Sequence, residues 1–405
     1  MTEVSCGARA SDEVRLARVA LTWLAEPGTW SVYDMVASDG PISALERLLA
    51  GDAPQPRLRA AVSARLAGGD PRSVAETALA RAHRLGARLA VPEDEEWPHQ
   101  VEDLVRLRLT GSGRRVDQET APPLCMWVRG SWPLAEALHR SVAVVGARAA
   151  TSYGTHVATD LGYGLAEREW TVVSGGAYGI DAAAHRGALT GGGLTVAVLA
   201  CGIDRPYPAG NAALFDRIAD TGLLISEWPP GADPLRPRFL IRNRVIAAAT
   251  SGTVLVEAAA RSGATQTLRR ALGLARPAMV VPGPVTSAMS VGCHELLRDH
   301  PETRLVTGVP HVLEEVGRIG ADLATPPRGR QHPRDLLDDD SALILESLPR
   351  RGALGPDELA VRAGIDIRTV LRKLSLLEEM GLLERRDAGY ALPGRSQPDF
   401  ISGSP

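Results

Sequence analysis

The residues best suited to chemistry are the arginines between positions 236 and 244. Four arginines fall within these nine residues, no acidic residue interrupts them, and Phe239 lies among them. A groove for a single-stranded nucleic acid needs positive charge along the phosphate backbone and an aromatic face on which a base stacks. A solvated helix start is the alternative, but Phe239 and Ile241 indicate a partly buried segment. The residues predicted to contact an unpaired polynucleotide here are Arg238, Phe239, Arg242, Asn243 and Arg244.

A glycine-rich stretch offers a second anion-binding element. It follows an apolar run, and its missing side chains let backbone N–H groups close around a phosphate. Its spacing is Gly-Gly-x-x-Gly, whereas dinucleotide sites use Gly-x-Gly-x-x-Gly and an acidic residue at the end of the next strand, which the run 195–200 lacks. With no Gly-x-x-x-x-Gly-Lys motif either, we expect neither NAD nor an ATPase P-loop, and no other cofactor. The predicted phosphate-binding residues are Ser174, Gly175, Gly176, Tyr178 and Gly179.

Two residues just after these glycines are expected to support the site. Asp181 falls in the first turn of the following helix, where a carboxylate suits the helix dipole, so capping and direct ligand contact are both open. His185 lies one turn further along, and a packing or hydrogen-bonding role is favoured over catalysis.

Two more strand ends are expected to bring helix N-termini to the same place. Gly146 lets the chain turn after the run 142–145, and Arg148 follows just before a helix. Ser262 and Gly263 open another helix. An anion there meets backbone N–H groups, the positive end of a helix dipole and the Arg148 guanidinium. An ordinary turn with a surface arginine is the alternative for Arg148.

The remaining supporting residues follow the next two strands of the pattern. Glu257 is expected to orient Arg242 or Arg244, or to accept a hydrogen bond from a base or sugar. Cys293 and His294 are adjacent, and a catalytic pair is disfavoured because neighbouring residues seldom point at each other. The supporting set predicted here is Glu257, Pro282, Gly283 and His294.

The elements that must position these residues alternate along the chain from residue 141. Apolar, β-branched runs at 142–145, 171–174, 195–200, 223–226, 253–256, 278–281 and 304–306 are separated by helical segments. Such runs indicate strands buried on both faces, so we predict an α/β fold with a doubly wound, mostly parallel, Rossmann-like sheet. Ligands of such sheets bind beyond the carboxyl ends of the strands, where all the candidate loops fall.

The flanking segments predict further domains. Short helices separated by Gly and Pro breaks indicate a small helical domain, and three helices followed by a Gly-turned hairpin indicate a C-terminal winged helix. The predicted organisation is 1–90 helical domain, 91–140 connector packed on the core, 141–318 Rossmann-like core, 319–338 linker, 339–395 winged helix and 396–405 disordered tail.

Composition limits the class of protein. The formal net charge of the 405 residues is −3, so a nucleic acid would have to bind a local basic patch. The four cysteines are far apart and form no CxxC pair, which disfavours a zinc site or disulfide framework and fits a reducing cytoplasm. We expect no signal segment, no membrane span and no metal.

Together these motifs resemble the DNA-processing protein A family, also called DprA or Smf. Seven motifs occur in the family's order over about 170 residues. They are Val144-Val145-Gly146-Ala147-Arg148, Ser174 to His185, Arg242-Asn243-Arg244-Val245-Ile246-Ala247, Val256-Glu257-Ala258, Arg261-Ser262-Gly263, Val281-Pro282-Gly283 and Gly292-Cys293-His294.

The resemblance implies a cytoplasmic, dimeric protein that binds single-stranded DNA. It would protect incoming DNA in natural transformation and load the RecA recombinase on it, without catalytic residues of its own. The residues that the resemblance implies for an anionic-ligand pocket are Arg148, Ser174, Gly175, Gly176, Arg242, Asn243, Arg244, Ser262 and Gly263.

The sequence also departs from the commoner family pattern. Ala147 stands where serine is frequent, and Tyr178 stands where a basic residue is usual, so Tyr178 is expected to stack on a base instead. Between 341 and 395 there are nine basic and eight acidic residues, and this balance leaves DNA contact and protein contact equally open for the winged helix.

Two rival functions remain at this stage. A nucleotide phosphoribohydrolase of the lysine-decarboxylase-like superfamily is suggested by Ser251-Gly252-Thr253 with Glu257, although the glycine count and the glutamate position differ from that signature. A transcription regulator that senses a nucleotide in the core would need duplex affinity from 339–393 alone.

Overall fold

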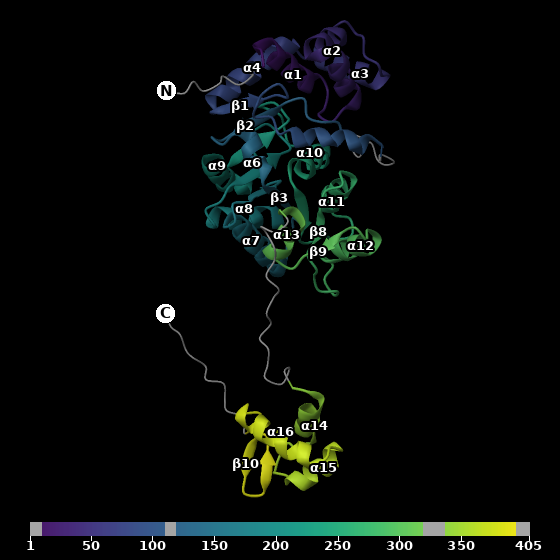
Figure 1. The fold of residues 1–405 in the computed structure, drawn as a ribbon. Helices are drawn as coiled ribbons and strands as arrows, with labels where there is room; N and C mark the ends of the chain where they lie inside the picture. Colours follow the sequence, from purple (N-terminus) through teal and green to yellow (C-terminus); the bar gives the residue numbers. More distant parts are fainter. Residues whose placement is uncertain (1–9, 110–118, 319–336, 394–405) are drawn as a thin grey trace. The chain divides into compact units, whose positions relative to one another are not determined.

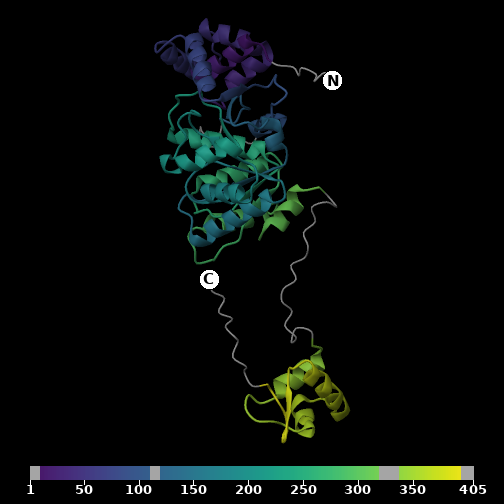
Figure 2. The same cartoon turned by 90° about the vertical axis from the view of Figure 1, so that its left-hand side faces the viewer.

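The computed structural model of the protein describes residues 10–109, 119–318 and 337–393. The chain forms two compact units, Met1–Ala324 and Thr325–Pro405 (Figures 1 and 2). The predicted linker as far as residue 336 and the predicted tail 396–405 lie outside the described residues. The finer domain boundaries stay predictions.

A nine-stranded sheet forms the centre of the described part of the first unit, in the order β1-β2-β6-β5-β4-β3-β7-β8-β9. From β6 to β9 in this order, neighbouring strands pair in parallel. These strands are β3 (Ser141–Val145), β4 (Thr171–Ser174), β5 (Thr195–Leu199), β6 (Leu223–Ser226), β7 (Gly252–Leu255), β8 (Ala278–Val280) and β9 (Arg304–Leu305). The chain moves from β3 to β6 on one side and then places β7 on the other side of β3, which confirms the predicted doubly wound fold.

The parallel strands lie between two layers of helices (Figure 1), and alternate strand residues pack towards opposite layers. Ala143 and Val145 pack towards one layer, and Val142 and Val144 pack towards the other. The first layer contains η1 (His99–Leu109), α6 (Leu134–His139), α10 (Arg236–Ala249), α11 (Gly263–Gly273) and α12 (Val291–Asp299), and the second contains α7 (Ser152–Ala166), α8 (Ile180–Thr190), α9 (Ala212–Thr221) and α13 (Val309–Val316). Because both faces are covered, most residues of β3 to β8 are apolar, as parallel sheets require.

Two antiparallel strands that the sequence did not predict extend this sheet. β1 (Ala87–Ala90) pairs with β2 (Met126–Arg129), and β2 pairs with β6. From the sequence, these residues were expected at the end of the helical domain and in the connector. Each strand has four residues, and their neighbourhood is rich in Pro and Trp, so the periodic signal was too short to identify them.

The four N-terminal helices lie at the β1 end of the sheet, coloured purple to blue in Figures 1 and 2. Their apolar side chains share one buried cluster with Trp127 of β2, Leu199 of β5 and Phe215 of α9. The helices are α1 (Asp12–Leu24), α2 (Trp30–Leu49), α3 (Pro56–Leu66) and α4 (Pro71–Arg84). Helix α2 continues across Pro41 and bends at Gly40, where φ is 79°.

The second unit has its own core. Its elements are α14 (Asp339–Ser347), α15 (Pro356–Ala363), α16 (Ile367–Glu379), β10 (Glu384–Arg386) and β11 (Gly389–Ala391). Ile344, Leu359, Val370, Leu374 and Leu377 are buried together. This element order is the predicted one, and assignment of the unit to the winged-helix fold remains a prediction.

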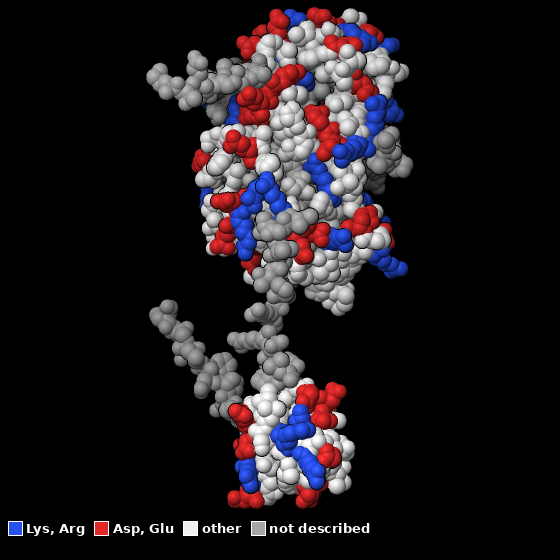
Figure 3. All heavy atoms as spheres, viewed as in Figure 1, with Lys and Arg blue, Asp and Glu red and all other residues white. Residues whose placement is uncertain are grey.

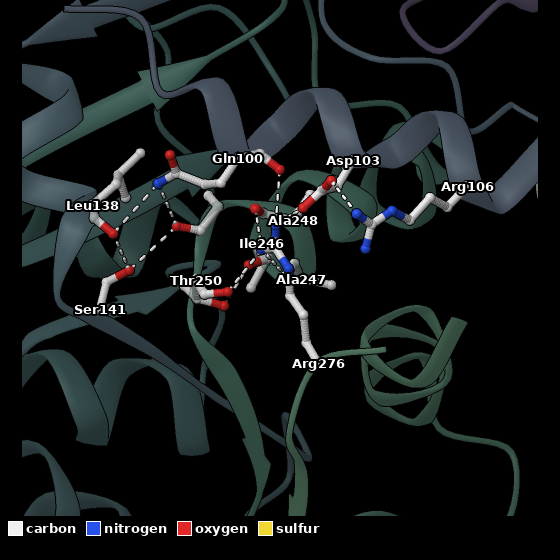
Figure 4. Close-up of polar contacts among 11 residues, drawn as sticks. Gln100, Asp103, Arg106, Leu138, Ser141, Ile246, Ala247, Ala248, Thr250 and Arg276 are labelled. Atoms are coloured by element: carbon white, nitrogen blue, oxygen red, sulfur yellow. Dashed lines mark hydrogen bonds and ion pairs between the residues drawn. The ribbon is translucent and has the colours of Figure 1, made fainter. Parts of the chain in front are cut away.

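Arg276 fixes the carboxyl end of α10 (Figure 4). Its guanidinium donates to the carbonyl oxygens of Ala247 and Thr250, at 3.0 and 2.7 Å, and to that of Ala248. It also reaches the Gln100 carbonyl at 2.8 Å and the Asp103 carboxylate at 3.1 Å. One cation thus satisfies the last carbonyls of α10 and ties η1 to the core.

Candidate functional site: a pocket at the strand-order reversal

A pocket of about 730 Å³ lies where the strand order reverses beside β3. Crevices at such a point are the usual ligand sites of doubly wound sheets, because loops from both directions diverge there. Its walls come from the loops after β3, β4, β5 and β6, from α10 and from the start of α11. The lining residues are Val145, Gly146, Arg148, Ala177, Asp181, Tyr207, Pro234, Arg236, Phe239, Leu240, Arg242, Asn243, Ile246, Ser262, Gly263, Ala264 and Thr267.

Two solvent-exposed arginines stand at this pocket. Arg148 and Arg236 are exposed, and within the described ranges neither forms an ion pair. The Arg148 guanidinium lies 5.1 Å from the ring centroid of Phe239, within cation–π range. Both cations are therefore available to a phosphate backbone beside an aromatic ring.

The N-terminus of α11 supplies a second source of positive potential. Ser262 caps this helix by accepting from the Ala264 N–H at 3.2 Å. Asn243 of α10 donates to the Gly263 carbonyl at 3.3 Å and so ties the two helix starts together. The first turn of α11 is thereby held at the pocket, with the dipole favouring an anion.

Arg242 is a buried part of the same wall. It donates through Nη1 to the Gly175 carbonyl at 2.9 Å and to the Val198 carbonyl, and through Nε to Asn243 Oδ1 at 3.2 Å. Burial lowers its pKa to about 10, with nearby Asp181 opposing that shift, so the guanidinium stays charged at neutral pH. A Cβ on Gly175 would lie 2.3 Å from Arg242 Nη1, so a larger residue there would displace the guanidinium.

The glycine-rich loop is closed by its own carboxylate. Asp181 accepts from the N–H groups of Gly175 and Ala177, at 3.2 and 3.4 Å. Burial raises the pKa of Asp181, and Arg242 counters this. The predicted phosphate nest therefore needs correction, because the Gly175 N–H already has an acceptor and the loop contributes shape and rigidity.

The other residues of this loop have structural surroundings. Ser174 is buried and donates to the Val144 carbonyl at 2.6 Å. Gly176 and Gly179 have φ of 69° and 77°, where a Cβ would lie 2.4 Å from the Phe215 ring and 2.3 Å from the Ala147 carbonyl oxygen respectively. Tyr178 is half exposed and does not line the pocket.

His185 is buried and hydrogen bonded. Its Nδ1 lies 2.7 Å from Thr195 Oγ1, whose hydrogen goes to the Val172 carbonyl, so the imidazole donates from Nδ1. Burial lowers the pKa of His185 to about 3, with Arg242 and Arg186 adding to the effect. A neutral, fully enclosed ring fits the packing role favoured from the sequence.

Two of the predicted DNA-binding arginines point elsewhere. Arg244 is inaccessible to solvent and forms two hydrogen bonds with the Glu227 carboxylate, at 2.8 and 2.7 Å. Arg238 pairs with Glu26, at 3.0 and 2.6 Å. Their placement in the anion site is therefore corrected. The fold brings an acidic partner to each, one from after β6 and one from the N-terminal helices.

Glu257 also has another task. Its carboxylate accepts from the N–H and hydroxyl of Thr151, at 2.9 and 2.5 Å, and so holds the start of α7. It contacts neither predicted arginine through a hydrogen bond. A Cβ on Gly154 would lie 2.2 Å from Glu257 Oε2, so this carboxylate needs the glycine beside it.

The loop after β8 also lies outside the pocket. The Pro282 carbonyl accepts from Tyr153 at 2.7 Å, and the Gly283 carbonyl lies 3.1 Å from His294 Nε2. Burial raises the pKa of Cys293 to about 12, which leaves its thiol protonated. The Cys293 Sγ lies 3.8 Å from the Val256 carbonyl oxygen, so Cys293 and His294 have separate partners.

Sequence reasoning missed Tyr207, which lines the pocket and meets Phe239 edge to face with ring centroids 5.6 Å apart. It is 45% exposed. Its signal was an aromatic residue between Pro206 and Pro208, just beyond the carboxyl end of β5. Eight predicted residues do line the pocket: Gly146, Arg148, Asp181, Phe239, Arg242, Asn243, Ser262 and Gly263.

No described helix is long and apolar enough to cross a bilayer. In the ranges that the structure describes, no cluster of three or more His, Cys, Asp or Glu side chains suits a metal. Over the face shown in Figure 3, acidic and basic side chains are interspersed.

The fold places the chain in the class of Rossmann-like proteins with a pocket at the strand-order reversal. The model of one such family, DNA recombination-mediator protein A, matches residues 88–317. The chain belongs to this family, as its motifs indicated.

Relatives and a solved structure agree with this membership. The putative DNA processing protein DprA of Mycobacterium tuberculosis is 44% identical over 385 residues, which cover 94% of this chain and 95% of the relative. The DNA processing protein DprA of Streptococcus pneumoniae is 39% identical over 193 residues, which cover 48% and 67%. The X-ray structure of the Streptococcus pneumoniae protein aligns with a TM-score of 0.61 and 28% identity, covering 76% of this chain and 100% of that chain.

Proposed function

We propose that this protein binds single-stranded DNA in the pocket beside β3, as a recombination mediator without catalytic chemistry. The observation that carries the proposal is the combination of exposed Arg148 and Arg236, the start of α11, and the aromatic pair Phe239 and Tyr207. Guanidinium groups suit phosphates, and aromatic faces suit the bases of a single strand. In a duplex the bases are stacked on one another, so their faces are not available.

Anisotropy of labelled oligo-dT and of duplex DNA over a salt series tests the proposal. Arg148→Ala and Arg236→Ala should each weaken oligo-dT binding and reduce the slope of log K against log salt by roughly 0.7, the value for one phosphate contact on a single strand. Phe239→Ala should cost roughly 1–3 kcal/mol of binding with little change in slope, since stacking releases no counterion.

Arg298→Ala is the matched control. Arg298 is exposed on α12, outside the pocket. Its replacement changes the net charge by the same amount as Arg148→Ala or Arg236→Ala but leaves the pocket unchanged. Wild-type affinity and salt slope in the double variant Arg148→Ala with Arg236→Ala would refute the site. Equal affinity of the wild type for duplex DNA and oligo-dT would refute the preference for single strands.

The biological role is the finer part of the proposal. We infer that the protein acts in the cytoplasm as a dimer, protects incoming single strands and loads the RecA recombinase on them. Support comes from family membership and from the pocket chemistry. Strand exchange by RecA on DNA coated with single-strand-binding protein, with and without this protein, measures loading; no acceleration at saturating protein would argue against it.

The phosphoribohydrolase alternative has less support. Its signature glutamate would be Glu257, which is hydrogen bonded to Thr151 at the start of α7. Incubation with nucleoside monophosphates tests it, and release of free base would favour the enzyme.

A further inference from the structure

A second pocket, of about 660 Å³, lies between the N-terminal helices and the segment that leads into α10. Trp23 and Arg65 line it from the helical side, and Trp228, Pro230 and Leu235 line it from the core side. Neither the family motifs nor the site beside β3 accounts for this cavity.

The two pockets share one wall. Residues 232–235 have no regular secondary structure and precede α10. Asp233 and Leu235 line the second pocket, whereas Pro234 and Arg236 line the pocket beside β3. Successive side chains of an extended segment point to opposite sides, so only one backbone separates the two cavities. Leu235 is 50% exposed on this wall.

The second pocket offers apolar and aromatic surface, and the exposed carboxylates of Asp70 and Asp233 also line it. Trp23 is partly exposed, with the Arg65 guanidinium 5.8 Å from its ring centroid, and Pro230 and Leu235 add apolar surface, whereas Trp228 is itself buried. Such walls suit a base, which presents a flat face of low polarity.

The arginines around this pocket are neutralised within the fold. Arg65 lies 3.5 Å from Glu26, and Arg81 pairs with Asp204; both arginine side chains are about two-fifths exposed. Glu26 keeps its closer contacts with Arg238 and Trp228, at 2.6 and 2.9 Å, so the half-exposed Arg65 guanidinium can turn from this carboxylate to a phosphate without large cost. The pocket should therefore strengthen binding mainly through stacking.

We propose that a DNA strand held beside β3 continues across the wall at Leu235 into the second pocket, where a base stacks on Trp23 and a phosphate meets Arg65. This rests on the proposed function and gives the N-terminal helices a direct part in DNA binding. The affinity should consequently rise with DNA length once the strand spans both pockets.

The test compares full-length wild type with Trp23→Leu and Arg65→Gln on oligo-dT of about 6 and about 16 nucleotides, lengths that bracket common single-strand site sizes. Both variants should bind the short oligonucleotide as wild type does. On the long one, Trp23→Leu should bind roughly ten-fold more weakly, and Trp23→Phe should recover most of the loss. Arg72→Gln, an exposed arginine of α4 outside both pockets, is the matched control.

The outcomes separate the two proposals. If neither length binds wild type, the proposed function fails. If wild type binds both lengths, and Trp23→Leu and Arg65→Gln match it on both, the second pocket is not on the DNA path and this inference is overturned. Circular dichroism and the unchanged short-oligonucleotide affinity show that a variant is folded.

Discussion

At the residue scale, the two arginines of the Arg242-Asn243-Arg244 motif have opposite surroundings. Arg242 lines the pocket, and Arg244 is paired with Glu227 in the interior. Successive helical positions differ by about 100°, so residues two apart face nearly opposite directions. A run of basic residues on a helix therefore cannot by itself indicate how many of them reach a ligand.

The Arg244–Glu227 pair gives a stability prediction. Arg244→Met should lower the free energy of unfolding by about 3–5 kcal/mol, because it leaves a buried carboxylate without its partner. The double variant Arg244→Met with Glu227→Leu should recover most of this loss, since an apolar pair replaces the ion pair. Urea unfolding measures both. DNA binding by folded Arg244→Met should match wild type, and a shallower salt slope would restore Arg244 to the site.

His185 predicts a pH dependence of stability. The pKa of this buried imidazole is about 3, against an ordinary 6.5, so below pH 6.5 the unfolded chain takes up a proton that the folded chain refuses. The stability that the neutral imidazole contributes to the folded state is fully present above pH 6.5. It is lost as the pH falls towards 3, by up to about 1.4 kcal/mol per pH unit. Between pH 7.5 and pH 5.5 the free energy of unfolding, measured in urea, should fall by about 1.4 kcal/mol less in His185→Asn than in wild type. The same fall in both proteins would mean that the ring titrates normally.

At the element scale, α10 carries the site at its start and is held by Arg276 at its end. Arg276→Met should destabilise the protein by about 3 kcal/mol, because several buried carbonyls of α10 and η1 lose their donor at once. The exposed Arg269→Met on α11 is the control and should change stability by less than about 0.5 kcal/mol. Equal unfolding free energies in the two variants, measured in urea, would contradict this role.

The parallel core could be predicted at this scale, because buried β-branched runs and the helices between them have strong, long signals. All seven predicted strands are present within a residue or two of their expected bounds. Because the carboxyl ends of these strands meet at one edge of the sheet, the position of the pocket could also be predicted. What the sequence could not supply were tertiary partners: Glu26 for Arg238, Glu227 for Arg244 and Thr151 for Glu257 come from distant positions, and only the fold decides these pairs.

At the scale of the whole molecule, the two compact units have separate cores. A fragment of residues 1–318 should therefore fold on its own and bind oligo-dT. A fragment of 141–318 should aggregate, because it loses β2 and exposes the edge of β6 together with Trp127's buried neighbours. Size-exclusion chromatography and anisotropy compare the two fragments; a monodisperse, DNA-binding 141–318 fragment would show that the added strands are dispensable.

The pairing of β2 with β6 also has a consequence for biosynthesis. The partner of β2 leaves the ribosome roughly a hundred residues after it, a delay of about 5–20 s at ordinary elongation rates. Throughout that interval Met126, Trp127 and Val128 can pair only with the earlier strand β1 and lack the parallel sheet, although all three are fully enclosed in the finished protein. The nascent chain is thus most vulnerable to aggregation between the emergence of Trp127 and that of Ser226, and translational pausing within this window should lower the yield of folded protein.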